Sequence, residues 1–452
     1  MDSVSTKHHR NTSRSSRPRS ATRGPLDGAD HPLSPTLPAS PTSPLRVLPS
    51  IDDFSGDTFH ELDPLAPDDL PETLGKDLSF LLRPNIYHTL SPIDIPSPLR
   101  SEFIVLNPSE PLSASLSVLE KLLAEGRFLI AAHFAGAILT SSLISSTNIK
   151  MIFALFYARL ASLELSGNTL LAAQESKALE DLNSSFYYID SDFDKSETDK
   201  ERHHPVERYP RHIVPWPLRV LAVRLQSIGF GDPRRSIGGL YEIGLEARRE
   251  IMRSDIPEEE REIWRRRLAD LGIRSVNALV EMGDLDAAKR SLDNLRDSNP
   301  ETSMTKMRKA LLLLRIGDID AASKVFSAED ESSRESALLQ PLLSMADGRY
   351  PTAVEEWRAL QQEGTRTDDA LVAQNLAVCL LYMGRLDEAR VLLESQVSAN
   401  HSFSSLVFNL STVYELCSDG ASSLKGQLAA SIAQQPVSGH TNLDRPNADL
   451  KL

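Results

Sequence analysis

The sequence predicts an all-α protein built as a solenoid of antiparallel helix pairs, with a disordered N-terminal tail. A short phrase that opens with glycine recurs four times in the second half of the chain, and each copy follows an apolar stretch with helical spacing. Apolar residues make up 40% of the chain and aromatic residues 6%, which suits helical repeats filled with leucine and alanine. Every periodic segment repeats at helical spacing, and none alternates polar and apolar residues as a half-buried strand does.

The recurring phrase defines the expected repeat unit. Its copies begin at Gly283, Gly317, Gly348 and Gly384. Their spacing stays close to about 34 residues, the period of the helix–turn–helix unit called the tetratricopeptide repeat, or TPR. We expect each glycine to end the first helix of its unit, where φ turns positive.

The phrase also assigns packing positions. The alanine five residues after each glycine is small enough to let the two helices of a unit approach closely. A large apolar residue four positions further on is expected to pack towards the next repeat. The alanines are Ala288, Ala322, Ala353 and Ala389, and the large residues are Leu292, Phe326, Trp357 and Leu393.

Residues 1–75 are predicted to form the disordered tail, because their apolar content is too low to offset chain entropy. Arg10–Arg23 is basic and serine-rich, and proline-rich sequence with several Ser-Pro steps follows. Two interpretations stay open: a regulatory tail phosphorylated at the Ser-Pro steps, or an inert solvated extension. The start of the chain has no apolar core of the kind that a secretory signal carries.

Residues 76–111 are expected to be an extended linker that anchors onto the first helices. Two short apolar pieces, Leu78–Leu82 and Phe103–Leu106, lie there in proline-rich sequence. Helical periodicity begins at Leu112, and the solenoid is therefore predicted to start at that residue.

The solenoid is predicted over residues 112–432, with its clearest repeats over 269–403 and a flexible tail over 433–452. Terminal repeats are often atypical because they cap the stack. Three weaker copies of the phrase begin at Gly126, Gly167 and Gly231, and a partial fifth unit has Gly420 in its turn.

Two charged segments stand out inside the predicted solenoid. Asp190–Arg211 is bounded by prolines and is interpreted as a long loop between helices. Glu246–Leu271 is a charged helical stretch, whose interleaved acids favour a solvated helix face over a patch for nucleic acid. The net charge of −14 also gives no overall attraction to nucleic acid or anionic lipid.

The sequence predicts no catalytic, cofactor or metal site. It has no phosphate-binding loop, dinucleotide fingerprint, serine-hydrolase elbow, zinc-protease motif or kinase signature. The pair His203-His204 lacks the cysteines or spaced carboxylates of a metal site. Cys379 and Cys417 lie in helical patterns as small apolar residues, which suits the cytosol. The longest apolar run, Phe128–Leu139, is too short to cross a bilayer. We expect a protein that is not an enzyme.

The candidate protein-binding groove lies on the expected helix Ser303–Arg315. The apolar side chains of Met304, Met307, Leu311 and Leu314 share one side of it by helical spacing. Such a set cannot clamp a peptide's C-terminal carboxylate, but it suits an apolar helix or strand of a partner. The alternative is that a neighbouring repeat covers these side chains.

Two longer motifs in the last third of the chain, Asn375–Leu386 and Leu406–Leu416, carry a family resemblance. They resemble the C-terminal TPR region of the subunit-twelve family of the transport protein particle (TRAPP) complex. Val214–Leu221 and Trp264–Leu268 stand in similar order before them, and Tyr187-Tyr188 fits an aromatic pair upstream.

The resemblance covers residues 112–432 and implies a non-catalytic scaffold or adaptor. The assembly it implies tethers vesicles and acts as a guanine-nucleotide exchange factor for a Rab-family GTPase, with the exchange activity in its small core subunits. Subunit twelve is similar to an adaptor that joins the large arm subunits, notably the eighth and eleventh. The implied roles are endoplasmic reticulum-to-Golgi transport and autophagy. The implied location is cytoplasmic, peripheral at Golgi or ER–Golgi intermediate membranes.

Two rival hypotheses come from other classes of protein. A TPR co-chaperone-type adaptor would bind peptide segments of other proteins, and the absent lysine and asparagine clamp counts against it. An enzyme built as a helical toroid would need a cluster of acids or histidines in a cavity, and the sequence indicates none.

Overall fold

The computed structural model describes residues 62–65, 76–88, 106–107, 110–189, 211–295, 303–325, 334–363 and 369–435. The expectations for residues 1–61, 66–75, 190–210 and 436–452, for Phe103 and Phe326, and for the side chain of Met304 lie outside this description.

The described part of the chain contains sixteen α-helices, and the prediction of an all-α solenoid is confirmed. The first eight are α1 (Leu112–Ala124), α2 (Phe128–Thr140), α3 (Ile149–Leu165), α4 (Thr169–Ser176), α5 (Trp216–Phe230), α6 (Pro233–Met252), α7 (Glu258–Met282) and α8 (Leu285–Asn294). The second eight are α9 (Ser303–Ile316), α10 (Ile319–Ser323), α11 (Arg334–Ala346), α12 (Tyr350–Glu363), α13 (Asp369–Tyr382), α14 (Leu386–Ser398), α15 (Ser404–Cys417) and α16 (Ala421–Gln434).

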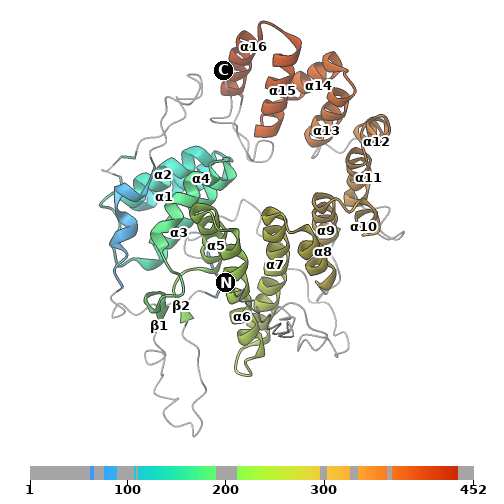
Figure 1. The fold of residues 1–452 in the computed structure, drawn as a ribbon. Helices are drawn as coiled ribbons and strands as arrows, with labels where there is room; N and C mark the ends of the chain where they lie inside the picture. Colours follow the sequence, from blue (N-terminus) through green and yellow to red (C-terminus); the bar gives the residue numbers. More distant parts are fainter. Residues whose placement is uncertain are drawn as a thin grey trace, which may run out of the picture.

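Each helix packs mainly against the helices that precede and follow it in the chain, which is the contact pattern of a solenoid. Figure 1 shows the resulting curved array, which runs from α1–α4 through α5–α9 to α15 and α16. The described core is divided along the array into apolar clusters centred on α1–α5, α5–α7, α7–α11 and α11–α16. Each helix pair is therefore held in place by its neighbours, with no single central core.

The glycine turns set the helix boundaries along the whole array. After each of seven glycines the next helix begins two residues later, and all seven have φ between 66° and 92°. A side chain is strained at such φ, and glycine is not. These glycines are Gly126, Gly167, Gly231, Gly283, Gly317, Gly348 and Gly384. The three weaker copies of the phrase thus have the same turn as the four clear ones, whereas Gly420 differs, with φ −90°.

Two short strands interrupt the helices between α4 and α5. β1 (Tyr188–Ile189) and β2 (Arg211–His212) pair antiparallel, with Tyr188 opposite His212 and Ile189 opposite Arg211. This pair is the one sheet among the described residues, and its last strand begins at Arg211, where the charged segment Asp190–Arg211 was interpreted as a loop. Strands of two residues are too short to show an alternating pattern in the sequence. They pair residues that lie on either side of the charged segment, more than twenty positions apart.

Residues 76–88 lie against α2–α4, and part of this segment is helical where an extended linker was expected. Two 3-10 helices form, over Ser79–Leu82 and Pro84–Ile86. Leu78 and Leu81 are fully buried in the first apolar cluster. The Leu78 N–H donates to the Ser146 carbonyl at 3.0 Å. The buried leucines and this backbone hydrogen bond together hold the segment on the array.

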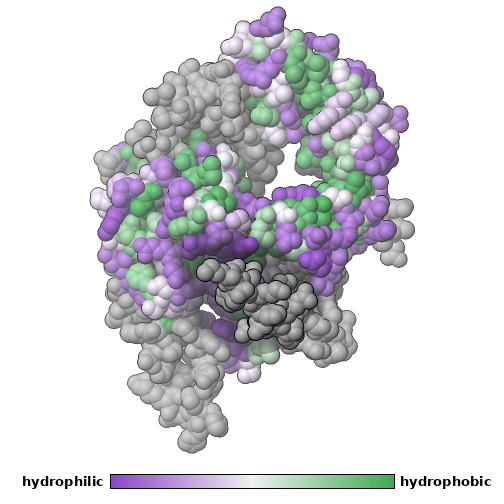
Figure 2. Space-filling view, in the orientation of Figure 1, coloured by the Kyte–Doolittle hydropathy of each residue, from purple (hydrophilic) through white to green (hydrophobic). Residues whose placement is uncertain are grey.

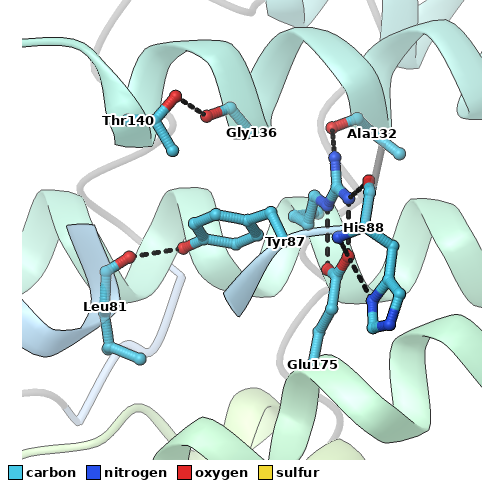
Figure 3. A network of polar contacts seen from close by, with 8 residues as sticks. Leu81, Tyr87, His88, Ala132, Gly136, Thr140 and Glu175 are labelled. Carbon is cyan, nitrogen blue, oxygen red and sulfur yellow. Dashed lines mark hydrogen bonds and ion pairs between the residues drawn. The ribbon is translucent and has the colours of Figure 1, made fainter. Parts of the chain in front are cut away.

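A buried ion pair holds the end of this segment on the array (Figure 3). Arg159 of α3 and Glu175 of α4 have side chains 3% and 0% exposed. Arg159 donates to Glu175 from Nε at 2.9 Å and from Nη2 at 2.6 Å. It also donates to the carbonyls of Ala132 at 2.9 Å and His88 at 3.0 Å. The His88 N–H in turn donates to Glu175 at 2.8 Å, so both charges are satisfied.

Candidate protein-binding surfaces

The predicted packing positions are buried wherever the structure describes them. Ala288, Ala322, Ala353 and Ala389 are 0% exposed. Leu292, Trp357 and Leu393 are exposed by 1% or less. The Trp357 indole N–H donates to the Met345 sulfur at 3.3 Å, which ties α12 to α11. These residues position the helices that carry exposed side chains, and they offer no surface to a partner themselves.

The predicted groove on α9 is divided between core and surface. Met307 and Leu314 are half-buried and pack against the cluster shared by α7, α8, α10 and α11. Leu311 is 40% exposed. Arg315, which borders the set, donates to the Asn277 side chain at 2.6 Å. The neighbouring helices thus partly cover two of the described side chains and leave Leu311 open, so a groove centred on α9 stays a proposal.

Apolar side chains are more exposed on α13 and α15, the first helices of the last two units. Leu371 is 50% exposed and Phe408 is 61% exposed. Ser405 of α15 donates to Gln374 of α13 at 3.2 Å. Residues three apart share a helix face, so Leu371 lies beside Gln374 and Phe408 lies beside Ser405. We call Leu371, Gln374, Ser405 and Phe408 the α13–α15 face.

The α13–α15 face was not found from the sequence, although it lies in the two longest motifs or beside them. Apolar residues are spread all round α13, so helical spacing does not separate its inward and outward sides. Figure 2 shows apolar surface over α15 and near α9 and α11, beside polar surface on neighbouring helices. The exposed apolar side chains on two neighbouring first helices make this face a candidate contact surface for a partner.

A second candidate surface surrounds the start of α5. A cavity of about 490 Å³ lies there, lined by Trp216, Arg219, Trp264, Arg267 and the β1–β2 pair. Arg219 donates to Glu246 of α6 from both terminal guanidinium nitrogens, Nη1 at 2.8 Å and Nη2 at 2.5 Å. The Arg219 side chain is 6% exposed, so the ion pair is fixed in the cavity wall.

His212 in β2 forms part of the same wall and is held neutral. Its Nδ1 accepts the Val214 N–H at 3.0 Å, and its Nε2 donates to the Leu182 carbonyl at 3.0 Å. Burial, reinforced by the charge of Arg219, lowers the pKa of His212 to about 3. The neutral ring satisfies both contacts, whereas a protonated Nδ1 would face the Val214 N–H with a second donor.

The described residues hold no group of three or more metal-ligating side chains close enough to bind a metal. Cys379 is buried, which raises the pKa of its thiol to about 11 and keeps it protonated near neutral pH. Cys417 is half-buried. His133 of α2 is half-buried, and burial together with Arg159 lowers its pKa. None of the described helices combines the length and apolar character that a bilayer crossing requires.

Comparison with known proteins relates this chain to a trafficking complex. A tetratricopeptide repeat family model matches residues 273–337, which covers the turns at Gly283 and Gly317. The mouse protein "Trafficking protein particle complex subunit 12" is 26% identical over 252 residues. The human protein of the same name is 25% identical over 249 residues. This chain is similar to subunit 12. The resemblance predicted from the sequence motifs is confirmed.

The similarity to subunit 12 covers part of each protein. It takes in 49% of this chain in both comparisons. It takes in 31% of the mouse protein and 34% of the human protein, so the matched region spans about a third of the curated relatives. The TPR fold is thus supported by the helices, the turns and the family model alike.

Proposed function

We propose that this chain is a non-catalytic scaffold subunit of a TRAPP-type vesicle-tethering complex. The observation that carries the proposal is the match to subunit 12 in two mammals, over about half of this chain. The solenoid supports it, because a curved array of helix pairs presents an extended surface to other proteins. The described side chains offer contact surfaces, and the arrangement assigns no residue a catalytic role.

The finer proposal places the chain next to the large arm subunits, the eighth and the eleventh. The Rab-family GTPase then meets the complex through the small core subunits, where the exchange activity lies. The proposed roles are endoplasmic reticulum-to-Golgi transport and autophagy, with a cytoplasmic protein peripheral at Golgi or ER–Golgi intermediate membranes. What supports these points is the resemblance of the two longest motifs, Asn375–Leu386 and Leu406–Leu416.

Co-purification of the full chain from native extract tests the proposal. We expect TRAPP core subunits to be recovered in stoichiometric amount. Recovery of a monomer that carries only chaperones would overturn the proposal and favour a co-chaperone adaptor. Recovery of the arm subunits without the core would support the scaffold role and contradict the link to the GTPase.

Paired charge substitutions test which surface the partner uses. Leu371→Glu with Phe408→Glu changes the α13–α15 face, and we expect it to release a partner subunit while the helical circular dichroism persists. Val391→Glu is the matched control, because Val391 is 59% exposed on α14, the second helix of its unit. Full partner binding by the paired variant, with normal stability, would move the interface elsewhere.

The α9 groove is tested in the same preparation. Met307→Glu with Leu311→Glu is expected to lower the melting temperature, because Met307 packs into the core cluster of α7–α11. If this variant instead stays as stable as the unaltered chain and loses a partner, α9 is the docking site. Stability and pull-down together therefore separate the two surfaces.

A further inference from the structure

One side of the cavity at the start of α5 is formed by a segment from far along this chain, which contributes Asp63 and Leu65 to its lining. Asp63 comes from residues 62–65, which are 153 positions before Trp216 and 204 before Arg267 in the hydrogen bonds that join them. The Asp63 side chain is only 8% exposed. Leu65 packs against the apolar cluster of α5–α7. A short stretch far from the solenoid in sequence thus inserts a carboxylate and an apolar side chain side by side.

Three donors meet this carboxylate, two from the cavity wall and one from the segment itself. The Trp216 N–H donates to Oδ2 of Asp63 at 2.9 Å, and Arg267 forms an ion pair with Oδ1. The Leu65 N–H donates to Oδ1 at 2.9 Å, which folds the segment into a turn around its own acid. Trp216 is the first residue of α5, where backbone N–H groups have no partner within the helix and favour an anion.

Arg267 is held in place for this task by two indole rings. Its guanidinium lies 4.8 Å from the centre of the Trp216 ring and 4.6 Å from that of Trp264. The two rings meet edge to face at 5.4 Å. The Arg267 side chain is 10% exposed, and burial lowers its pKa against the opposing effect of Asp63. A desolvated cation in a rigid aromatic frame requires an anion beside it.

Trp264, which also lines the cavity, has a donor that the segment does not use. Trp264 is 8% exposed, and its indole N–H is buried without a hydrogen-bond acceptor among the described residues. Burial of an unpaired donor is costly, so an occupant that brings a further acceptor to this N–H gains stability. The segment Leu62–Leu65 therefore satisfies the carboxylate position and the apolar position but brings no acceptor to the Trp264 indole.

We propose that this cavity is a docking site for a short acidic–apolar peptide of a partner protein, and that Asp63–Leu65 occupies it in cis as a replaceable substitute. The ligand carries a carboxylate, an apolar side chain two residues later, and an acceptor for the Trp264 indole. The proposal does not depend on the trafficking complex, because it rests on contacts within this chain. The partner peptide competes with the chain's own segment for Arg267 and the Trp216 N–H.

Fluorescence anisotropy with labelled peptides tests the competition on the full chain. The first probe is a synthetic peptide of residues 60–67 of this chain, and the second keeps Asp-Pro-Leu but changes the residues on either side. The Asp63→Asn and Leu65→Ala variant releases the cis segment. We expect it to bind both probes saturably and at least ten-fold more tightly than the unaltered chain.

Matched variants separate recognition from unfolding. Adding Arg267→Met to the released variant removes the cation and keeps much of the side-chain volume, and it is expected to abolish binding. A probe with Asn in place of Asp is expected to lose binding in the same way. Leu65→Ala alone, a milder release, is expected to give intermediate affinity, so the series remains interpretable if the double change unfolds α5.

Three results would overturn the proposal. Binding that survives Arg267→Met places the probe outside the cavity. No saturable binding by either released variant, with helical circular dichroism intact, shows that the cavity accepts no peptide in trans. Binding of the first probe but not the second restricts the cavity to the chain's own segment and eliminates the partner.

Discussion

The buried pair of Arg159 and Glu175 allows a quantitative test of the first helix pairs. Replacing Glu175 with leucine leaves the guanidinium without two of its four hydrogen bonds and without a counter-charge. Breaking a buried ion pair in this way costs about 3–5 kcal/mol. Replacing both residues, Arg159→Met with Glu175→Leu, removes the charge and loses the Ala132 and His88 carbonyl contacts, each worth about 1 kcal/mol.

We therefore expect the double variant to be more stable than Glu175→Leu alone, by about 2 kcal/mol. Urea unfolding followed by circular dichroism measures the difference, and hydrogen exchange assigns it to α2–α4. The matched control is the pair Arg385 and Glu388, which has the same chemistry but side chains 37% and 50% exposed. Breaking that exposed pair is expected to cost less than about 1 kcal/mol.

Two outcomes would refute this reasoning. A cost for Glu175→Leu no larger than that for Glu388→Leu would show that water reaches Arg159. Equal costs for Glu175→Leu and the double variant would show that the unpaired charge is not the source of the instability. Either outcome would also weaken the assignment of residues 76–88 to this site, because His88 contacts both charges.

Three further predictions concern packing and pH. Ala389→Arg, which places a charge at a site 0% exposed, is expected to cost about 3–5 kcal/mol in urea unfolding, and an unchanged midpoint would mean that the repeat register is wrong. Gly136→Ala puts a Cβ 2.6 Å from Arg159 Nη1 and is expected to lower the melting temperature. Gly426→Ala is the control, because its Cβ would meet open space, and it is expected to keep the melting temperature equal or raise it. Burial lowers the pKa of His212 to about 3 in the folded chain. The stability that the neutral ring gives to the fold is therefore fully present above pH 6.5 and is lost as the pH falls towards 3. At pH 5 the loss is about 2 kcal/mol, and His212→Gln should remove this part of the pH dependence of unfolding.

The repeat units were predictable because each glycine turn is a local event. A residue with positive φ ends one helix, and the next begins two residues later. Helical periodicity predicted a first helix from Leu112 and another helix over Ser303–Arg315, and the structure has α1 from Leu112 and α9 over Ser303–Ile316. The one boundary that differs shifts by one residue, which is within the variation usual at helix ends.

The groove was harder to predict because a run of leucines hides the inward face of α9. Leu311, Leu312, Leu313 and Leu314 are consecutive, so every side of the helix carries an apolar residue. Leu312 and Leu313 are 7% and 3% exposed, whereas Leu311 is 40% exposed. The choice among them depends on where α7 and α11 lie, and helical spacing does not contain that information.

The contacts of Asp63 and His88 explain why Asp63 was assigned to the disordered tail and why the ion pair that holds His88 was not predicted. Both segments reach the array through charge-assisted hydrogen bonds to residues far along the chain, 204 positions away for Asp63 with Arg267 and 87 for His88 with Glu175. Such contacts have no period and no local motif, whereas a solenoid is otherwise built from neighbours. They also change what a shortened chain would display. Removing residues 1–111 would uncover Arg267 and the surface under Leu78 and Leu81 together. Partner binding by residues 112–432 alone would then report on surfaces that the full chain keeps covered, and binding assays therefore need the full chain.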